Sequence, residues 1–422
     1  MRKAILVICI VYVVLRLVLH VGMLVGWIPG GEETWLGTDL VINLEAARYL
    51  DAREDLYVLG KMEILELFHY SPLYAVTTIP ASRVSFTAAA LWHTLITCLS
   101  YVGLYLMWRH MFRKWGLVGP QRALDVLLPL WLIYGAFWGD LSFLNIYTAL
   151  SLLATVLIYA VVEERLGLAV LAAFLLLQAK PQWAFALAVP LILRRDRFFW
   201  RLIGWTLAAY VAAALVTILA VGWEYGVRQY ANYYQFLLGM TANFRWRGPE
   251  VSLGYNHSLM QIAYHLFGIN PAIGRIVIAL KVAIILPLAW LAWRLAVSRL
   301  GQRERSPLLA LDVAWAFYLA AFIWLDVMWE LTLAIAIYTY VMPYIRKLWA
   351  RVAVSVPFLL YAIQDVYLVI IYALSSENPT LNYFAADIAT HVPVIMIVLL
   401  TLYAVILARL AGWLRSAAAH GL

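Results

Sequence analysis

Charged side chains are scarce in this sequence. Only 13% of its 422 residues are Asp, Glu, Lys or Arg, whereas 65% are hydrophobic and 14% are aromatic. A water-soluble domain carries about a quarter of charged residues. The composition therefore excludes an ordinary soluble protein and predicts an all-α membrane protein that crosses the bilayer many times.

Cysteine is nearly absent as well. Cys9 and Cys98 both lie inside apolar runs, so they supply no metal-ligand spacing and no information about the redox compartment. The sequence also lacks a His/Cys cluster that would indicate zinc and a Walker-type glycine loop that would indicate a soluble nucleotide. Metal and nucleotide sites are therefore not indicated by any motif.

Long apolar runs are what the sequence has instead. The first, 4–28, follows Arg2 and Lys3, is longer than the apolar core of a signal peptide and lacks a small-x-small cleavage site, so we interpret it as a retained anchor. A membrane-spanning helix needs about 20 apolar residues. With the first anchor, twelve segments are candidates: 86–108, 123–138, 141–162, 166–178, 183–193, 199–221, 272–295, 307–325, 329–345, 350–374 and 387–410.

The formal net charge of +8 is distributed over alternate loops. Such spreading is the pattern that sets membrane orientation and argues against nucleic-acid binding. The basic loops mark the cytoplasmic side, so both termini are expected inside the cell. The chain 1–422 is then a single membrane domain with two long exoplasmic loops, 29–85 and 222–271.

Asp39 is the first candidate for chemistry. The segment 35–73 holds the densest cluster of acidic residues, and Asp39 stands nearest the end of the first apolar span. An ionisable group at a membrane boundary is a functional candidate by default, and burial would raise its pKa toward the range useful for a general base. The alternative is an ordinary helix N-cap ahead of 40–50. The other acidic residues fit the solvated faces of amphipathic helices.

Three further polar groups lie near predicted exoplasmic turns. Tyr70 belongs to an aromatic segment that Pro72 keeps extended, and it serves either as a membrane-belt residue or as a sugar-binding group. Asp140 and Asn145 either point into a cavity or act as a helix cap and an interhelical contact.

The segment 178–182, Gln-Ala-Lys-Pro-Gln, interrupts an apolar run. A proline frees backbone carbonyls that must find partners, and Lys180 at this depth needs an anion. That anion is an internal carboxylate or the phosphate of a bound ligand, and we favour the phosphate. Gln182 is a candidate ligand contact beside it.

The later exoplasmic segments hold the remaining candidates. Arginine alternating with tryptophan beside a membrane suits phosphate and sugar contacts or headgroup anchoring, and His257 either assists departure of a phosphate or is structural. Two acidic residues four apart would share one helix face and partner Lys180 or an arginine, or bind sugar hydroxyls. These candidates are Arg245, Arg247, Asn256, His257, Asp326 and Glu330.

These motifs together resemble the polyprenyl-phosphate-mannose-dependent mannosyltransferases of the GT-C superfamily, most nearly glycosyltransferase family 87. Asp39 after the first span and the Tyr-x-Pro segment at Tyr70 match in type and position, as do the Lys-Pro segment at Lys180 and the Asn-x-Ser segment at Asn256. Two positions differ. The family's Gly-Gln turn reads Gly-Asp at Asp140, and its Trp-x-x-His turn has no histidine near 329–330.

The resemblance implies a GT-C-like bundle and an inverting transfer of a hexose, mannose for this family, from a polyprenyl-phosphate sugar to a glycolipid or glycan. The active site would face the exoplasmic side of a prokaryotic cytoplasmic membrane. Asp39 would be the catalytic base. The donor phosphate would be bound by Lys180, Arg245, Arg247 and His257, and the sugar or acceptor by Tyr70, Asp140, Asn145, Gln182, Asn256, Asp326 and Glu330.

The resemblance also implies that no cofactor and no metal are needed, because the leaving group is already a phosphate. Two other function classes remain open. A flippase or transporter of lipid-linked sugars would need polar groups in the membrane, but it should show internal repeats or charges near the midplane. A GT-C-like glycan ligase would share the scaffold and the lipid-phosphate donor.

Overall fold

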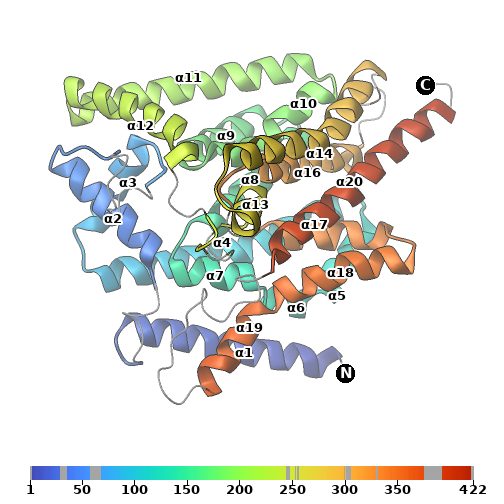
Figure 1. Ribbon diagram of the computed structural model, residues 1–422, viewed down its shortest axis with the longest axis horizontal. Helices are drawn as coiled ribbons and strands as arrows, with labels where there is room; N and C mark the ends of the chain where they lie inside the picture. The colour runs from blue at the N-terminus through green and yellow to red at the C-terminus, as the bar shows by residue number, and fades with distance from the viewer. Residues whose placement is uncertain are drawn as a thin grey trace.

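The computed structural model describes residues 2–28, 36–57, 68–243, 248–251, 253, 256–298, 300, 306–328, 331–374 and 392–419. Within these ranges the chain forms helices and connecting turns and contains no β-strand (Figure 1). The all-α prediction is confirmed. In Figure 1, α1 and α11 lie at opposite edges of the molecule, with α8 and α16 between them in this view.

Within the part of the chain that the structure describes, seven helices are long and apolar enough to cross a membrane, and an eighth span results if one bent pair is counted as a single span. The protein is therefore a polytopic membrane protein. The seven are α1 (Arg2–Leu24), α4 (Phe86–Lys114), α11 (Asp196–Val221), α14 (Pro271–Ser298), α16 (Pro307–Trp324), the run of α18 (Leu348–Ala362) into α19 (Gln364–Leu374), and α20 (Val394–Ala419).

The other helices are shorter or broken. The bent pair, with an angle of 58°, joins α5 (Val118–Val126) to α6 (Leu128–Leu132) and α7 (Gly135–Phe143). Three short apolar stretches follow: α8 (Tyr147–Val162), α9 (Leu166–Ala179), and the 3₁₀ helix η2 (Pro181–Ala188) with α10 (Val189–Ile192). The remaining elements are α2 (Thr38–Asp51), α3 (Pro72–Ser82), α12 (Trp223–Asn243), α13 (Leu259–Phe267), α17 (Ala334–Val341) and η4 (Met342–Tyr344).

The span count differs from the twelve that hydropathy predicts. The predicted segments 141–162, 166–178 and 183–193 form helices too short to cross a bilayer as straight spans. In the described part of 329–345, which begins at 331, the helical elements are α17 and η4. α8 and α17 are largely buried by protein, so their apolar side chains serve packing between helices, whereas α9 leaves Leu171 and Leu175 exposed. The count of twelve therefore stays a prediction.

The core lies around α16. Nearly three-quarters of its apolar window, 72%, is buried, whereas α1 and α11 bury 17% of theirs. α16 packs against α20, η2 and α14. Tyr318 and Phe322 contact Trp183 of η2, whereas Trp315 contacts Trp108 of α4. The peripheral helices present apolar side chains outward, as lipid-facing helices do.

Two breaks between helices place the residues of the functional region. α9 ends at Ala179 because Pro181 disfavours helical backbone at the residue before it, and Lys180 is accordingly extended (φ −138°, ψ 99°). The second break follows α7, where Leu144 takes a left-handed conformation (φ 50°). Both breaks lie against protein, the only place in a membrane where irregular backbone is tolerated.

Gly135, the first residue of α7, lies against the α18–α19 junction. A Cβ placed on it would stand 2.9 Å from the Tyr361 carbonyl oxygen and 2.9 Å from Gln364 Cγ. We expect Gly135→Ala to lower the free energy of unfolding by about 1–3 kcal/mol, since the backbone carbonyl cannot give way. Thermal unfolding in detergent measures the change.

Gly204 in the lipid-facing helix α11 provides the control, because a Cβ there meets nothing within 4 Å. Gly204→Ala should raise the stability by about 0.5–1 kcal/mol through helix propensity alone. An unfolding midpoint for Gly135→Ala equal to that of Gly204→Ala would contradict the close approach of α7 to the α18–α19 junction.

Candidate functional site

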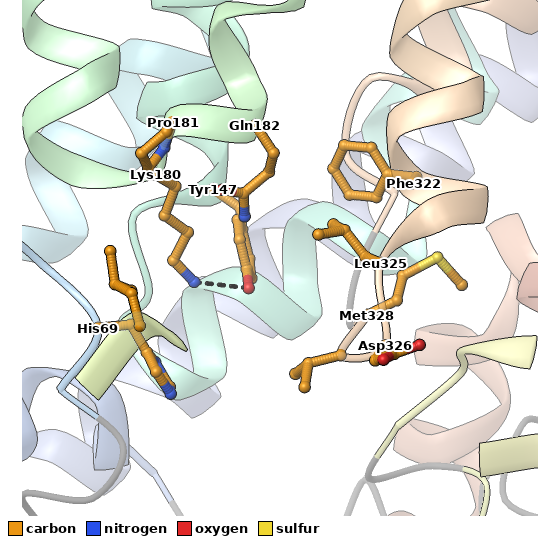
Figure 2. A pocket seen from close by; sticks show the side chains of 11 residues that line it. His69, Tyr147, Lys180, Pro181, Gln182, Phe322, Leu325, Asp326 and Met328 are labelled. Atoms are coloured by element: carbon orange, nitrogen blue, oxygen red, sulfur yellow. Dashed lines mark hydrogen bonds between the residues drawn. The ribbon is translucent and has the colours of Figure 1, made fainter. Parts of the chain in front are cut away.

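A cavity of about 120 Å³ opens between the α9–η2 break and the segment that follows α16. Figure 2 shows Lys180, Pro181, Gln182, Tyr147 and His69 on one side of it, facing Phe322, Leu325, Asp326 and Met328 on the other. One wall is therefore mainly polar and the opposite wall mainly apolar. Leu237 of α12 and Val327 complete the lining.

Lys180 is the central cation of the polar wall. Its side chain is 5% exposed, and its ammonium donates a hydrogen bond to the Tyr147 hydroxyl at 2.7 Å (Figure 2). The ammonium also lies 4.1 Å from the centre of the Tyr147 ring and 5.4 Å from that of Tyr70. Two aromatic faces thus stabilise a buried charge that still lines the cavity.

Asp39 lies in the first turn of α2. Gly37, in a left-handed conformation (φ 77°), is the N-cap residue of this helix, so Asp39 does not take the N-cap role that was the alternative to chemistry. One Asp39 carboxylate oxygen accepts a hydrogen bond from the Asn145 amide at 2.7 Å. A carboxylate in the first helical turn is also favoured by the helix dipole.

Burial raises the pKa of Asp39 to about 6, and the nearby Lys180 ammonium and the Asn145 hydrogen bond oppose that rise. Asp39 and Lys180 therefore lie within electrostatic reach of each other. Of the residues that the structure describes, eleven line the cavity, and Asp39 is not among them. Lys180 lines the cavity and also acts on Asp39 electrostatically. That Asp39 and Lys180 open into one cavity stays a prediction.

The junction between α7 and α8 holds this arrangement together. Asp140 is 1% exposed, and its two carboxylate oxygens accept hydrogen bonds from the Tyr147 amide at 3.0 Å and the Thr148 amide at 2.8 Å. Asp140 thereby caps α8, the alternative to a cavity role. Asn145, five residues later, instead binds Asp39 directly.

The Tyr70 segment docks onto the end of α9. Ser71 is extended (φ −66°, ψ 159°), as Pro72 predicts, and caps α3 through its hydroxyl. The same hydroxyl donates to the Gln178 side-chain oxygen at 2.6 Å, and the Ser71 amide donates to the Gln178 carbonyl at 3.1 Å. Tyr70 is buried and stacks on Tyr74 at 4.3 Å. The segment therefore forms part of the packing around Lys180.

Asn256 and His257 support the opposite wall. The Asn256 amide donates to the Asp326 carbonyl at 2.9 Å, while its side-chain oxygen accepts from the Met328 amide at 3.1 Å. The His257 amide donates to the Met328 carbonyl at 2.8 Å. Burial lowers the pKa of His257 to about 3, so its ring is neutral near neutral pH. These bonds fix the 326–328 segment.

The Asp326 carboxylate forms an ion pair with Lys281 of α14. Lys281 also donates to the Trp324 carbonyl at 2.8 Å and to the Leu325 carbonyl at 3.3 Å. The partner expected from the sequence was Lys180 or an arginine. Lys281 takes that place because the end of α16 turns back over α14, a tertiary contact that sequence spacing does not reveal.

Of the remaining predicted contact residues, one lines the cavity and the others lie outside the described part of the chain. Gln182 is half-buried and lines the cavity beside Lys180. Arg245, Arg247 and Glu330 lie outside the described residues. Within the described ranges, no group of three or more His, Cys, Asp or Glu side chains is arranged to hold a metal ion.

Two polar residues of the cavity lining, Tyr147 and His69, are not among the site residues that the sequence predicts. Tyr147 supplies the hydrogen-bond acceptor for Lys180, and a search for partners of a buried lysine among tyrosines at predicted turns would have suggested it. His69 precedes the Tyr70 segment and lines the cavity. Burial, and then the Lys180 ammonium, lower the pKa of His69 to about 3, so it presents a neutral imidazole.

The coupling of Asp39 to Lys180 yields a prediction. Lys180→Met removes the positive charge that opposes the effect of burial, so the pKa of Asp39 should rise above about 6. An infrared pH titration of the protonated-carboxyl band, with the Asp39→Asn spectrum subtracted, measures that pKa. Lys347→Met, at an exposed position, should leave it unchanged because surface charges are screened. An unchanged pKa in Lys180→Met would show that the two groups do not interact.

Comparison with known proteins gives no relative. No family model, no curated protein and no solved structure matches this chain.

Proposed function

We propose that this protein is an integral-membrane inverting glycosyltransferase. It would transfer a hexose, mannose by resemblance, from a polyprenyl-phosphate sugar to a glycolipid or glycan acceptor on the exoplasmic face. The proposed scaffold is a GT-C-like bundle of about twelve spans in a prokaryotic cytoplasmic membrane. The observation that supports it is that the Lys180 ammonium lines a cavity and also lies close enough to Asp39 to lower the pKa of its carboxyl.

Asp39 has the properties of a general base. Its pKa of about 6 keeps it ionised at neutral pH and still basic enough to accept a proton. In the proposed reaction it takes the proton of an acceptor hydroxyl as that oxygen attacks the anomeric carbon. The bond from this carbon to the phosphate oxygen breaks through an oxocarbenium-like transition state, and the polyprenyl phosphate leaves.

Lys180 has the properties of an anion-binding group. Its ammonium lines the cavity, is held between two aromatic rings and is shielded from bulk water. A fixed positive charge in such a low-dielectric place stabilises negative charge as it develops on a departing phosphate. The phosphate itself is the leaving group, so the proposal assigns no metal and no cofactor to the reaction.

The two walls of the cavity suit an amphipathic donor. Lys180, Gln182 and His69 offer polar groups to a phosphate and a sugar, and Phe322, Leu325 and Met328 offer apolar surface to the first part of a lipid chain. Binding sites commonly combine an apolar lining with a few placed polar groups. The acceptor would approach Asp39 from the exoplasmic side.

The direct test is a transfer assay with a panel of polyprenyl-phosphate sugars and purified protein. Asp39→Asn preserves size and hydrogen bonding to Asn145 but removes the base, so turnover should fall by about 10²–10⁴-fold. Asp125→Asn is the matched control, because Asp125 is a half-exposed residue of α5 paired with Arg109. Full turnover by Asp39→Asn would remove Asp39 as the base, whereas lipid-sugar translocation without transfer would favour a transporter.

A pH profile tests the same assignment. The wild-type kcat/KM should rise through an inflection near pH 6, where Asp39 loses its proton, and it should fall again above about 8, because burial lowers the pKa of Lys180 to about 8. Asn145→Ala removes a hydrogen bond that lowers the pKa of Asp39, so the inflection should move to higher pH. An inflection that stays in place, or moves to lower pH, would contradict control of the reaction by this carboxyl.

A further inference from the structure

A buried ion pair joins α1 to α19. The Arg16 guanidinium lies 3.1 Å from the Asp365 carboxylate, and the two side chains are 1% and 0% exposed. The Tyr12 hydroxyl donates a hydrogen bond to the same carboxylate. Burying two charges is costly even when they are paired, and ionisable residues inside membrane-spanning helices are functional candidates. The proposed reaction does not use this pair.

Arg16 also reaches α7. Its second terminal nitrogen donates to the Ser142 hydroxyl at 2.7 Å, and its guanidinium carbon lies 5.5 Å from the centre of the Trp138 ring. Tyr12 contacts the edge of the same ring at 6.0 Å. Arg16 therefore contacts α7 at two residues of one face, Trp138 and Ser142, which lie one turn apart. Ser142 belongs to the last turn of α7.

Ser142 is bonded in turn to the start of α2. Its backbone carbonyl accepts a hydrogen bond from the Gly37 amide at 2.8 Å. Asp39 follows two residues later, and Asn145, three residues after Ser142, donates to the Asp39 carboxylate. A Cβ on Gly37 would stand 2.8 Å from Phe86 Cζ and 3.2 Å from Leu144 Cδ1, so this turn is tightly enclosed.

We propose that Arg16 and Asp365 are positioning residues for Asp39, acting through Ser142. By holding the last turn of α7, the ion pair fixes the carbonyl that binds Gly37 and the amide of Asn145 that binds Asp39. The inference rests on the proposed function, because only a catalytic role of Asp39 gives a reason for this carboxyl to be held in one place. A group that accepts a proton must stay within hydrogen-bond reach of it, and small displacements lower rates strongly.

Several groups face Asp39 from the elements around it. They are Asn145 after α7, Lys180 at the α9–η2 break, Asp140 in α7, and Tyr70 and Tyr74 at the start of α3. Arg16 and Asp365 are not among the groups that shift the pKa of Asp39 directly. Their influence on Asp39 therefore runs through the geometry of Ser142, and a change of the pair should act on Asp39 only by moving it.

The test uses two variants that keep the network partly intact. Ser142→Ala removes only the hydroxyl that Arg16 binds, and Arg16→Lys keeps the charge but loses the forked donor. Arg409→Lys is the matched control, because Arg409, which is half-buried, forms an ion pair at 2.8 Å with the buried Asp312 and so joins α20 to α16. All three changes should lower thermal stability, so stability alone does not decide the proposal.

The deciding readout is labelling of Asp39 in the full-length protein by a hydrophobic carbodiimide, which reacts with protonated carboxyls, followed across pH by peptide mass spectrometry. In Ser142→Ala and Arg16→Lys the labelling midpoint should rise by about half a unit or more, because a displaced Asn145 amide binds Asp39 less well and that hydrogen bond lowers the pKa of Asp39. The midpoint in Arg409→Lys should match the parent. A smaller shift in both test variants overturns the proposal.

The transfer assay separates this proposal from the proposed function. With an active wild type, kcat of Ser142→Ala should fall by about tenfold while KM is unchanged, because Ser142 lies away from the cavity lining. A wild-type kcat in that variant overturns the positioning role and leaves the glycosyltransferase in place. A shifted labelling midpoint in a protein that transfers no sugar supports the positioning role and rejects the glycosyltransferase.

Discussion

A carboxyl and an ammonium held away from water stabilise each other's charged form, and the site depends on that mutual stabilisation. Burial alone would push Asp39 toward its neutral form. The Lys180 charge and the Asn145 hydrogen bond counter that tendency, while Tyr147 and Tyr70 surround the ammonium. The pair persists at the edge of a largely apolar bundle because each of its members has partners. A ligand phosphate would enter an environment already arranged for charge.

The short stretch from Asp140 to Tyr147 organises those partners. Asp140 caps α8, Ser142 binds the Gly37 amide, Asn145 binds Asp39 and Tyr147 binds Lys180. Residues of this one helical break thus cap α8 and bind both the Asp39 carboxylate and the Lys180 ammonium. The break is tolerated because protein surrounds it and supplies hydrogen-bond partners for its backbone.

The sequence predicts well where physics is local. The long apolar helices α1, α11 and α14, the extended Ser71 before Pro72, and the end of α9 at Lys180 all follow from hydropathy or proline geometry. It predicts poorly where partners come from distant elements. Apolar content cannot separate lipid contact from protein contact, and α8, which was expected to span, has most of its residues buried by protein. Likewise Lys281 for Asp326 and Tyr147 for Lys180 require the fold itself.

For the candidate site, too, the sequence predicts local features and not contacts between distant elements. Residue type and loop position single out Asp39 and Lys180, and the structure brings them within electrostatic reach. Position alone does not distinguish a side chain that contacts a ligand from one that supports a wall. The Asn256 amide secures the backbone of Asp326 and Met328, and its expected contact with a sugar stays a prediction.

Lys281 gives one wall of the cavity a connection to the bilayer. Its helix, α14, turns Ile276 and Trp290 outward, with exposed fractions of 62% and 53%, and carries Lys281 inward to the carbonyls of Trp324 and Leu325. The wall is therefore attached to a helix whose tilt depends on hydrophobic thickness. We therefore expect acyl-chain length in the surrounding membrane to affect the shape of the cavity.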